Sequence, residues 1–188
     1  MKIRFLAGQG RSLLKNLLSV YCICLMCCGL LLVSCRSSIA PSGMTVKIER
    51  VVSGNTLEIL GQNNQEQLFE KVRLIGIDAP DLKQQPWGLA AKQQLENMIN
   101  NETVLLETDL ENKDRYGRLM AYIWQKDLLL NEQLIAAGYA LYVPRSPNNK
   151  YNQRFARAQE KARLLGLGIW NPQQPMRLTP AEFRQQYR

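Results

Sequence analysis

The sequence predicts a small α+β domain, mainly β, in which five strands close into a barrel accompanied by about three helices. Three observations favour this class. From Met44 onward, apolar and polar residues alternate as they do in strands with one buried face. Only one segment of helical periodicity, residues 87–101, interrupts the series of strand-like segments. The remaining helical patterns gather toward the C-terminal end, an arrangement that fits a small closed barrel.

The expected elements follow one another at short intervals. Strand patterns cover 44–52, 56–60, a segment that opens at Lys71, 103–110 and 117–125, and a polar hairpin connection at 61–67 precedes the third. Helical patterns cover 87–101, 131–138 and 154–166, and a capping box that begins at Thr179 predicts a last short helix. The five-stranded oligonucleotide-binding (OB-fold) barrel matches this order best, and a plain α+β sandwich is the alternative that the pattern leaves open.

Residues 1–35 have the three parts of a secretory signal. A basic start is followed by an apolar run at 17–33, and the segment ends in Leu-Val-Ser-Cys. These four residues resemble the lipobox of bacterial lipoproteins, in which the cysteine, here Cys35, is lipidated and becomes the new N-terminus. An uncleaved transmembrane helix is the alternative, because the apolar run is near the ~20 residues that span a bilayer. In either case we expect a membrane-anchored domain in the cell envelope that faces outside the cytoplasm.

The rest of the chain divides into three parts. Residues 36–43 are predicted to be a linker, 44–170 the OB-fold domain, and 171–188 a C-terminal tail that can hold a short helix. The other four cysteines lie upstream of Cys35 and would be removed with a cleaved signal. Disulfides are therefore not expected to stabilise the domain.

Charge and composition limit the chemistry. The net charge is +8, and four of the 24 basic residues lie in the first 35 residues, beside no acidic residue. The remainder carries a modest excess of +4, which is compatible with a polyanionic partner. The chain has no histidine. Its absence excludes Ser-His-Asp and Cys-His nucleophiles and His-based metal sites, so a catalytic site would use carboxylates, Arg, Lys, Tyr and a bound metal ion.

The segment 71–81 concentrates the residues suited to such a site. Arg73 lies within an apolar strand pattern, where a charge is costly unless it has a partner. Asp78 and Asp81 bracket a tight turn that contains Pro80. A guanidinium and two carboxylates this close in sequence have the chemistry to bind a phosphate and hold a cation.

Three segments, in this order, resemble the staphylococcal nuclease (thermonuclease) family. They are VVSGNTLEI at 51–59, VRLIGIDAPD at 72–81 and KDRYGR at 113–118, and the resemblance covers roughly residues 44–170. It implies the same five-stranded barrel and calcium-dependent cleavage of DNA and RNA phosphodiesters. It also implies that Arg73 and Arg118 bind the phosphate, where guanidinium groups would stabilise the charge of the transition state.

The resemblance places a calcium ion on Asn55, Asp78 and the backbone carbonyl of Ala79. The family pattern usually has aspartate where this chain has Asn55, so the site has one negative charge fewer and should bind calcium more weakly. A glutamate that positions or deprotonates water is replaced by the shorter Asp81. A displacement of ~1 Å at a reacting group can cost ~10²-fold in rate. The sequence therefore leaves two readings, a metal-dependent nuclease of weakened activity and a catalytically inactive barrel that binds nucleic acid or another polyanion.

The resemblance also suggests contacts to the nucleotide. Arg115 and Tyr116 accompany Arg118, as a phosphate attractor and a stacking ring respectively. Tyr139 and Tyr142 lie where the family has aromatic base contacts, and a one-residue difference in length leaves their correspondence open. We expect DNA or RNA as substrate, the membrane as attachment site, and a monomer.

Overall fold

The structure is a computed structural model that describes residues 41–60 and 69–187. The predicted signal segment, Cys35 and the polar connection at 61–67 lie outside the described residues. The folded unit begins at Pro41. Within the described part of the chain, no helix combines the length and apolar character needed to cross a membrane.

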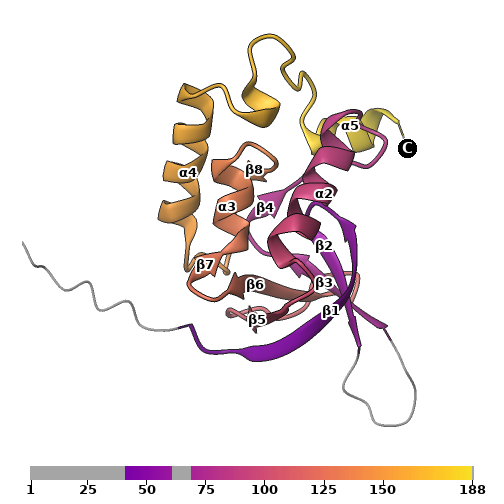
Figure 1. The fold of residues 1–188 in the computed structure, drawn as a ribbon, viewed down its shortest axis with the longest axis vertical. Coiled ribbons are helices and arrows are strands. Elements are labelled where there is room, and N and C mark those ends of the chain that lie inside the picture. Colours follow the sequence, from indigo (N-terminus) through magenta and orange to yellow (C-terminus); the bar gives the residue numbers. More distant parts are fainter. Residues whose placement is uncertain (1–40, 61–68, 188) are drawn as a thin grey trace, which may run out of the picture. The chain divides into compact units, whose positions relative to one another are not determined.

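The described elements follow the predicted order closely (Figure 1). The strands are β1 (Met44–Ser53), β2 (Thr56–Leu60), β3 (Phe69–Leu74), β4 (Ile77–Asp78), β5 (Thr103–Glu107), β6 (Leu119–Gln125), β7 (Leu128–Leu129) and β8 (Leu141–Tyr142). The helices are α2 (Trp87–Ile99), α3 (Leu130–Ala136), α4 (Asn152–Leu164), the 3₁₀ turn η1 (Gly168–Trp170) and α5 (Pro180–Gln186). Four α-helices are thus described, against about three expected, because the capping box at Thr179 does begin a helix.

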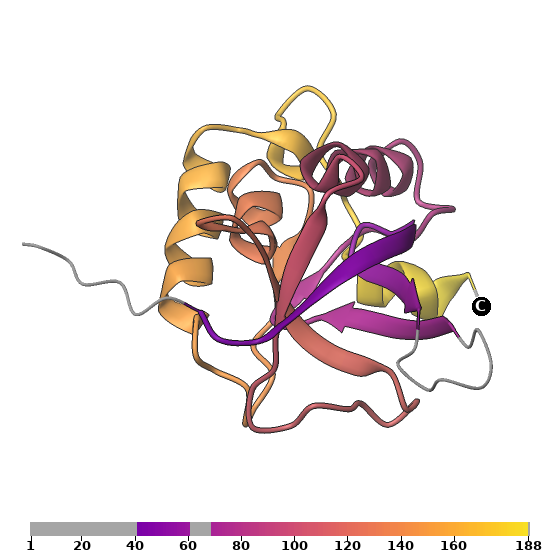
Figure 2. The same ribbon diagram turned by 60° about the horizontal axis from the view of Figure 1, so that its bottom comes forward.

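Five strands close into a mixed barrel, which confirms the predicted OB-fold class. The strands are paired in the order β3-β2-β1-β5-β6, and a pairing between β3 and β6 completes the ring. That last pairing is parallel, with Val72 opposite Leu119 and Leu74 opposite Ala121, whereas the others are antiparallel. Figure 2 shows the strands crossing steeply, as barrel closure requires.

Strand β6 lies at the centre of the core. Its residues Met120–Trp124 are all buried. One face of β6 contributes to the barrel interior, and the other is covered by α3, which packs in turn on α4. This two-sided burial explains why the segment reads as a continuous apolar run rather than as an alternating strand.

Helix α2 is shorter than the predicted 87–101. It stops at Ile99 because Asn100 adopts a left-handed conformation, with φ of 47°. Leu89, Leu95 and Ile99 recur at helical spacing, which predicts one buried face. Leu95 and Ile99 are buried, whereas Leu89 is largely exposed.

The apolar segment that opens at Lys71 forms two strands rather than one. After β3, the chain turns at Ile75 and Gly76 and begins β4, which pairs with β8. Gly76 has a φ of 75°, and a Cβ there would lie 2.7 Å from the ring of Phe155. Glycine therefore permits both the turn and the close packing of α4. The uninterrupted apolar pattern conceals this turn.

Two buried polar side chains connect the helices to the barrel. Asn131, at the start of α3, accepts from the backbone N–H of Ile123 (2.9 Å) and donates to the carbonyl of Ile75 (2.8 Å). Glu107 of β5 accepts from Trp124 Nε1 (2.7 Å) and from the Tyr151 hydroxyl (2.9 Å). Burial and the bond to Glu107 raise the pKa of Tyr151 to about 12, so this hydroxyl remains a donor at neutral pH.

Replacing Glu107 with alanine should lower the free energy of unfolding by about 3 kcal/mol, because buried donors that lose their acceptor cost about 1–3 kcal/mol each. Chemical denaturation followed by tryptophan fluorescence would measure the change. The control is Glu49→Ala, an exposed position on β1, which should stay within about 0.5 kcal/mol of the wild type. Equal stability of the two variants would contradict the role of Glu107.

Candidate functional site

A cleft of about 850 Å³ opens where six chain segments meet. It is lined by the β1–β2 turn, the β3–β4 region and the loop that follows β4. The turn before β6, the loop after β8 and helix α5 complete it. Of the residues that resemble the family pattern, Asn55, Arg73, Asp78, Ala79, Asp81 and Arg118 all line this one cleft, together with Arg115 and Tyr116.

Arg73 reaches into the cleft from β3. Its Nη1 donates to the carbonyls of Asn55 (3.2 Å) and Leu74 (3.3 Å). Its Nη2 donates to the carbonyl of Ile77 (2.8 Å) and to Asp78 Oδ1 (3.2 Å). These bonds fix the guanidinium plane, while Nε–H donates to none of the residues that the structure describes. One N–H therefore remains for a ligand.

The surroundings of Arg73 lower its pKa to about 10. Burial of the guanidinium is the largest cause, and the charges of Arg118, Arg184 and Arg145 add to it, while Asp78 acts in the opposite direction. Four arginines are thus close enough to influence one another. Such a cluster favours an anion that neutralises it.

Asn55, in the β1–β2 turn, is buried beside Arg73. Its Oδ1 accepts from the hydroxyls of Ser53 (3.0 Å) and Thr56 (3.3 Å), and its Nδ2 donates to Asp78 Oδ1 (3.2 Å). The neighbouring Gly54 packs on α2, since a Cβ there would lie 2.6 Å from the Cβ of Ala91. The amide of Asn55 therefore presents its nitrogen, rather than its oxygen, to Asp78.

Asp78 has basic partners on both carboxylate oxygens. Oδ1 accepts from Arg73, and Oδ2 accepts from Arg184 of α5 at 2.6 Å. Arg184 was not among the residues expected at the site. Its only sequence signal is its position two residues after Glu182 of the capping box, and that pattern indicates a helix rather than a contact.

Asp81 lies in the loop that follows β4, half-buried. Its Oδ1 accepts from the backbone N–H of Lys83 (2.9 Å), and Oδ2 takes no hydrogen bond from any described residue. The start of α2 packs on the Asp81 backbone, because a Cβ at Gly88 would lie 1.9 Å from its carbonyl oxygen. Gly88 therefore helps to set the position of Asp81, a role that the helical pattern gave no reason to expect.

Arg118 is held by the turn that precedes β6. Asp114 Oδ2 accepts from Arg118 Nε (2.8 Å) and Nη2 (2.6 Å), and Asp114 Oδ1 accepts from the backbone N–H groups of Tyr116 and Arg118. Burial alone would raise the pKa of Asp114, but these hydrogen bonds and the charge of Arg118 hold it below its usual value. Asp114 is thus ionised and fixes the guanidinium at the edge of the cleft.

Tyr116 is 62% exposed beside the cleft. The guanidinium of Arg115 lies 4.8 Å from its centroid and that of Arg118 lies 5.4 Å away. Arg115 also donates to the Tyr116 hydroxyl (2.8 Å). An accessible aromatic face flanked by two cations is well suited to stacking a base beside a phosphate.

The structure does not bring Tyr142 into this group. Tyr142 lies in β8 opposite Ile77, and its ring packs on Phe155 with centroids 6.1 Å apart. Tyr139 is half-buried against the core. The next residues, Val143 to Arg145, do line the cleft, so Arg145 is the basic group that this loop contributes.

The charged side chains of the cleft are mostly basic. Lys83, Arg145 and Arg184 join the three arginines already predicted, against the carboxylates of Asp78, Asp81 and Asp114. An excess of positive charge in a concave site attracts polyanions.

The side chains around Asp78, in their present hydrogen bonds, do not form a ligand set suited to a calcium ion. Calcium takes six to eight oxygen ligands, several of them carboxylates. Within the described residues, no three acidic, histidine or cysteine side chains converge. Asp78 gives both oxygens to guanidinium groups, and the oxygen of Asn55 already accepts from two hydroxyls.

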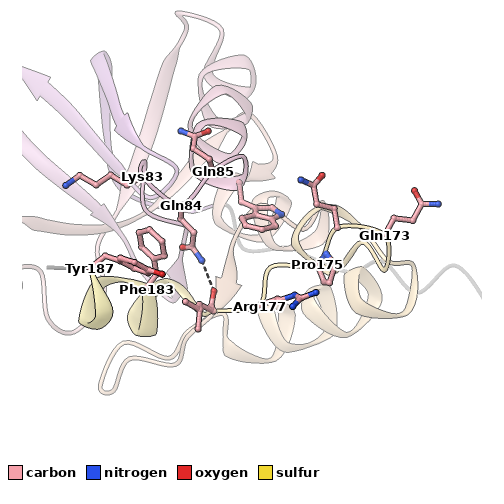
Figure 3. A pocket seen from close by; sticks show the side chains of 11 residues that line it. Lys83, Gln84, Gln85, Gln173, Pro175, Arg177, Phe183 and Tyr187 are labelled. Carbon is pink, nitrogen blue, oxygen red and sulfur yellow. Dashed lines mark hydrogen bonds between the residues drawn. The ribbon is translucent and has the colours of Figure 1, made fainter.

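A second pocket of about 510 Å³ lies between the loop after Asp81 and the C-terminal segment. Figure 3 shows Phe183 of α5 and Tyr187, which follows that helix, beside Gln84, whose Nε2 donates to the carbonyl of Leu178 (2.7 Å). Lys83 lines both this pocket and the cleft. The bond from Gln84 attaches the segment that leads into α5 to the loop that carries Asp81.

Comparison with known proteins agrees with this geometry. The chain is 36% identical over 140 residues to a thermonuclease of Staphylococcus intermedius, covering 72% of this chain and 81% of that protein. A thermonuclease of Staphylococcus hyicus is 36% identical over 132 residues, covering 68% and 76%. An uncharacterized endonuclease of Haemophilus influenzae is 30% identical over 158 residues, covering 84% and 82%. Residues 71–172 match the family described as staphylococcal nuclease homologue. The barrel, the cleft and these relatives lead to one conclusion: the chain belongs to the staphylococcal nuclease family and carries a nuclease domain.

Proposed function

We propose that the chain hydrolyses phosphodiester bonds of DNA or RNA in the arginine-lined cleft. The observation that carries this proposal is the convergence of Arg73 and Arg118 on a cleft that also contains the carboxylate of Asp81. Both guanidinium groups are held by fixed acceptors, so they do not need to be ordered when a substrate binds.

Each group has a definite role in this proposal. The free Nε–H of Arg73 and the guanidinium of Arg118 bind phosphate oxygens and stabilise the additional negative charge of the transition state. The free Oδ2 of Asp81 accepts a hydrogen bond from the attacking water and takes up its proton as the water oxygen bonds to phosphorus. The bond from phosphorus to the ester oxygen breaks, and the departing alkoxide takes up a proton from solvent. Tyr116 stacks on a base next to the cleaved bond.

The family resemblance also implies calcium dependence. When bound, such an ion would supply Lewis acidity beside the phosphate. Asp78, Asn55 and the Ala79 carbonyl are the groups that would hold it, but their present hydrogen bonds do not favour it. We therefore assign no step of the reaction to the ion.

A second function, binding of nucleic acid without cleavage, is favoured by one observation. Asp78 and Asp114 are both paired with arginines. Of the three carboxylates that line the cleft, only that of Asp81 is then left to act on water, which is a small catalytic set for a nuclease. Binding alone would need only the basic side chains, and it would weaken steeply with salt.

The full chain, purified in detergent, should cleave single-stranded DNA, and Arg73→Ala should lower the rate about 10²–10³-fold by removing a transition-state donor. Gel assays in calcium, magnesium, manganese and EDTA would measure it. Arg157→Ala, which removes an exposed arginine of α4, should match the wild type. Salt-sensitive binding without cleavage in any condition would instead support the second function.

DNA binding should weaken as the pH rises through about 10, because burial and neighbouring arginines lower the pKa of Arg73 to that value. A guanidinium is charged below its pKa, so the contact is present at neutral pH and is lost above 10. Fluorescence anisotropy with phosphorothioate DNA between pH 8 and 10.5 would measure the loss. Arg73→Gln should bind more weakly at pH 8 and fall less steeply. Parallel curves for the two proteins would contradict the assignment.

We further propose that the nuclease domain is tethered to a membrane outside the cytoplasm through lipidated Cys35. The support is the lipobox-like ending of the first 35 residues. The short interval between Cys35 and the folded unit at Pro41 would hold the domain close to that surface.

Cys35→Ala should abolish fatty-acid labelling of the protein and lower its amount in the membrane fraction when it is expressed in a lipoprotein-forming bacterium. Labelling with a fatty-acid analogue followed by fractionation would measure this. Cys28→Ala is the matched control, because it lies upstream of the expected cleavage and should leave labelling unchanged. Equal labelling of both variants would refute lipidation at Cys35.

A further inference from the structure

The contact between Arg184 and Asp78 joins the C-terminal helix α5 to strand β4. Arg184 Nη2 donates to Asp78 Oδ2 at 2.6 Å, across 106 residues of sequence. Asp78 is buried, and the Arg184 side chain is 35% exposed because it lines the open cleft. No other hydrogen bond is found for this guanidinium within the described residues. Its remaining N–H groups are therefore available to a ligand in the cleft.

The position of Arg184 is fixed by three sets of contacts. The capping box of α5 is complete, since the Thr179 hydroxyl accepts from Glu182 N–H and the Glu182 carboxylate accepts from Thr179 N–H. Gln84, only 4% exposed, holds the carbonyl of Leu178 just before the helix (Figure 3). Phe183 and Tyr187 pack together with ring centroids 4.7 Å apart. The helix thus has a defined attachment to the loop that carries Asp81.

The negative charge of Asp78 is more than neutralised without a metal ion. Asp78 contributes one negative charge, and Arg73 and Arg184 contribute two positive charges within hydrogen-bond distance of it. A divalent cation at Asp78 would meet two guanidinium groups and an amide N–H instead of the oxygens that it requires. The replacement of a carboxylate by Asn55 removes the negative charge that would otherwise offset this repulsion.

We propose that Arg184 is the resident cation of this site. Its guanidinium binds Oδ2 of Asp78, the carboxylate oxygen that Arg73 does not contact. Its remaining N–H groups face the phosphate, so that cleavage does not require calcium. The inference rests on the proposed nuclease function. Arg184 is then a further phosphate-binding residue, and its positive charge takes the place of the charge of a metal ion.

An ion pair that merely fastens α5 to the barrel makes different predictions. Such a pair would affect stability alone and would leave the response to calcium unchanged. A resident cation would instead keep calcium out of the site, and its removal would let calcium bind Asp78. The calcium affinity of an Arg184 variant therefore separates the two roles, independently of any activity.

The test compares the full chain in detergent with Arg184→Gln, Arg184→Lys and Arg177→Gln. The last variant is the matched control, because it removes an exposed arginine from the same segment outside the cleft. Calcium binding is measured by titration calorimetry with calcium alone, and cleavage of single-stranded DNA is measured in EDTA and in millimolar calcium. Thermal unfolding of each protein shows whether the barrel is intact.

The wild type and Arg177→Gln should cleave equally well in EDTA and in calcium, within about twofold. Arg184→Gln should lose about 10²-fold of the EDTA activity and should bind calcium about tenfold more tightly than the wild type, because a carboxylate oxygen becomes free. Arg184→Lys should keep part of the activity, because it retains the positive charge but loses the planar set of N–H donors.

Two results would overturn the proposal: loss of wild-type cleavage in EDTA, or unchanged calcium affinity in a folded Arg184→Gln protein. If none of the proteins cleaves DNA in any condition, the proposed nuclease function fails. The calorimetric comparison still decides in that case whether Arg184 excludes calcium from Asp78.

Discussion

The burial of one charge, that of Arg73, constrains the rest of the cleft. Its guanidinium joins the β1–β2 turn, the end of β3 and the start of β4 through the carbonyls of Asn55, Leu74 and Ile77. A cation in this position needs every one of these acceptors to offset the loss of water. The group proposed to bind phosphate is therefore part of the barrel wall, and neither can change without the other.

Much of the fold follows from local patterns. The period-two alternation of β1 and the helical period of α2 are properties of neighbouring residues, so the sequence alone predicts them. The barrel closure is different, because it depends on the parallel pairing of β3 with β6. The turn at Gly76 is also hidden, since Ile75 and Ile77 extend the apolar run on both sides.

The candidate site likewise contains residues that local sequence motifs predict and residues that only the tertiary structure identifies. The sequence motifs contain Arg73, Asp78, Asp81 and Arg118, and the structure places all four on one cleft. The sequence does not predict that Arg145 and Arg184 belong to the site. Arg145 lies in a loop and Arg184 in a short helix far along the chain, and only the fold brings them to the cleft. Tyr142 illustrates the opposite case: pairing of β8 with β4 directs its ring to Phe155 instead of the cleft.

Because α5 completes the cleft, the charge of the cleft depends on the last part of the chain to be synthesised. Asp78 meets its second guanidinium only after 106 further residues have been made. Chains emerge and fold from the N-terminal side, so the strands of the barrel are available before the cleft acquires its full charge. A protease that cuts between Trp170 and Thr179 would leave the strands intact, and non-covalent contacts alone would then hold Arg184 at Asp78. The electrostatic character of the cleft thus depends on the integrity of a peripheral segment that contributes no strand to the barrel.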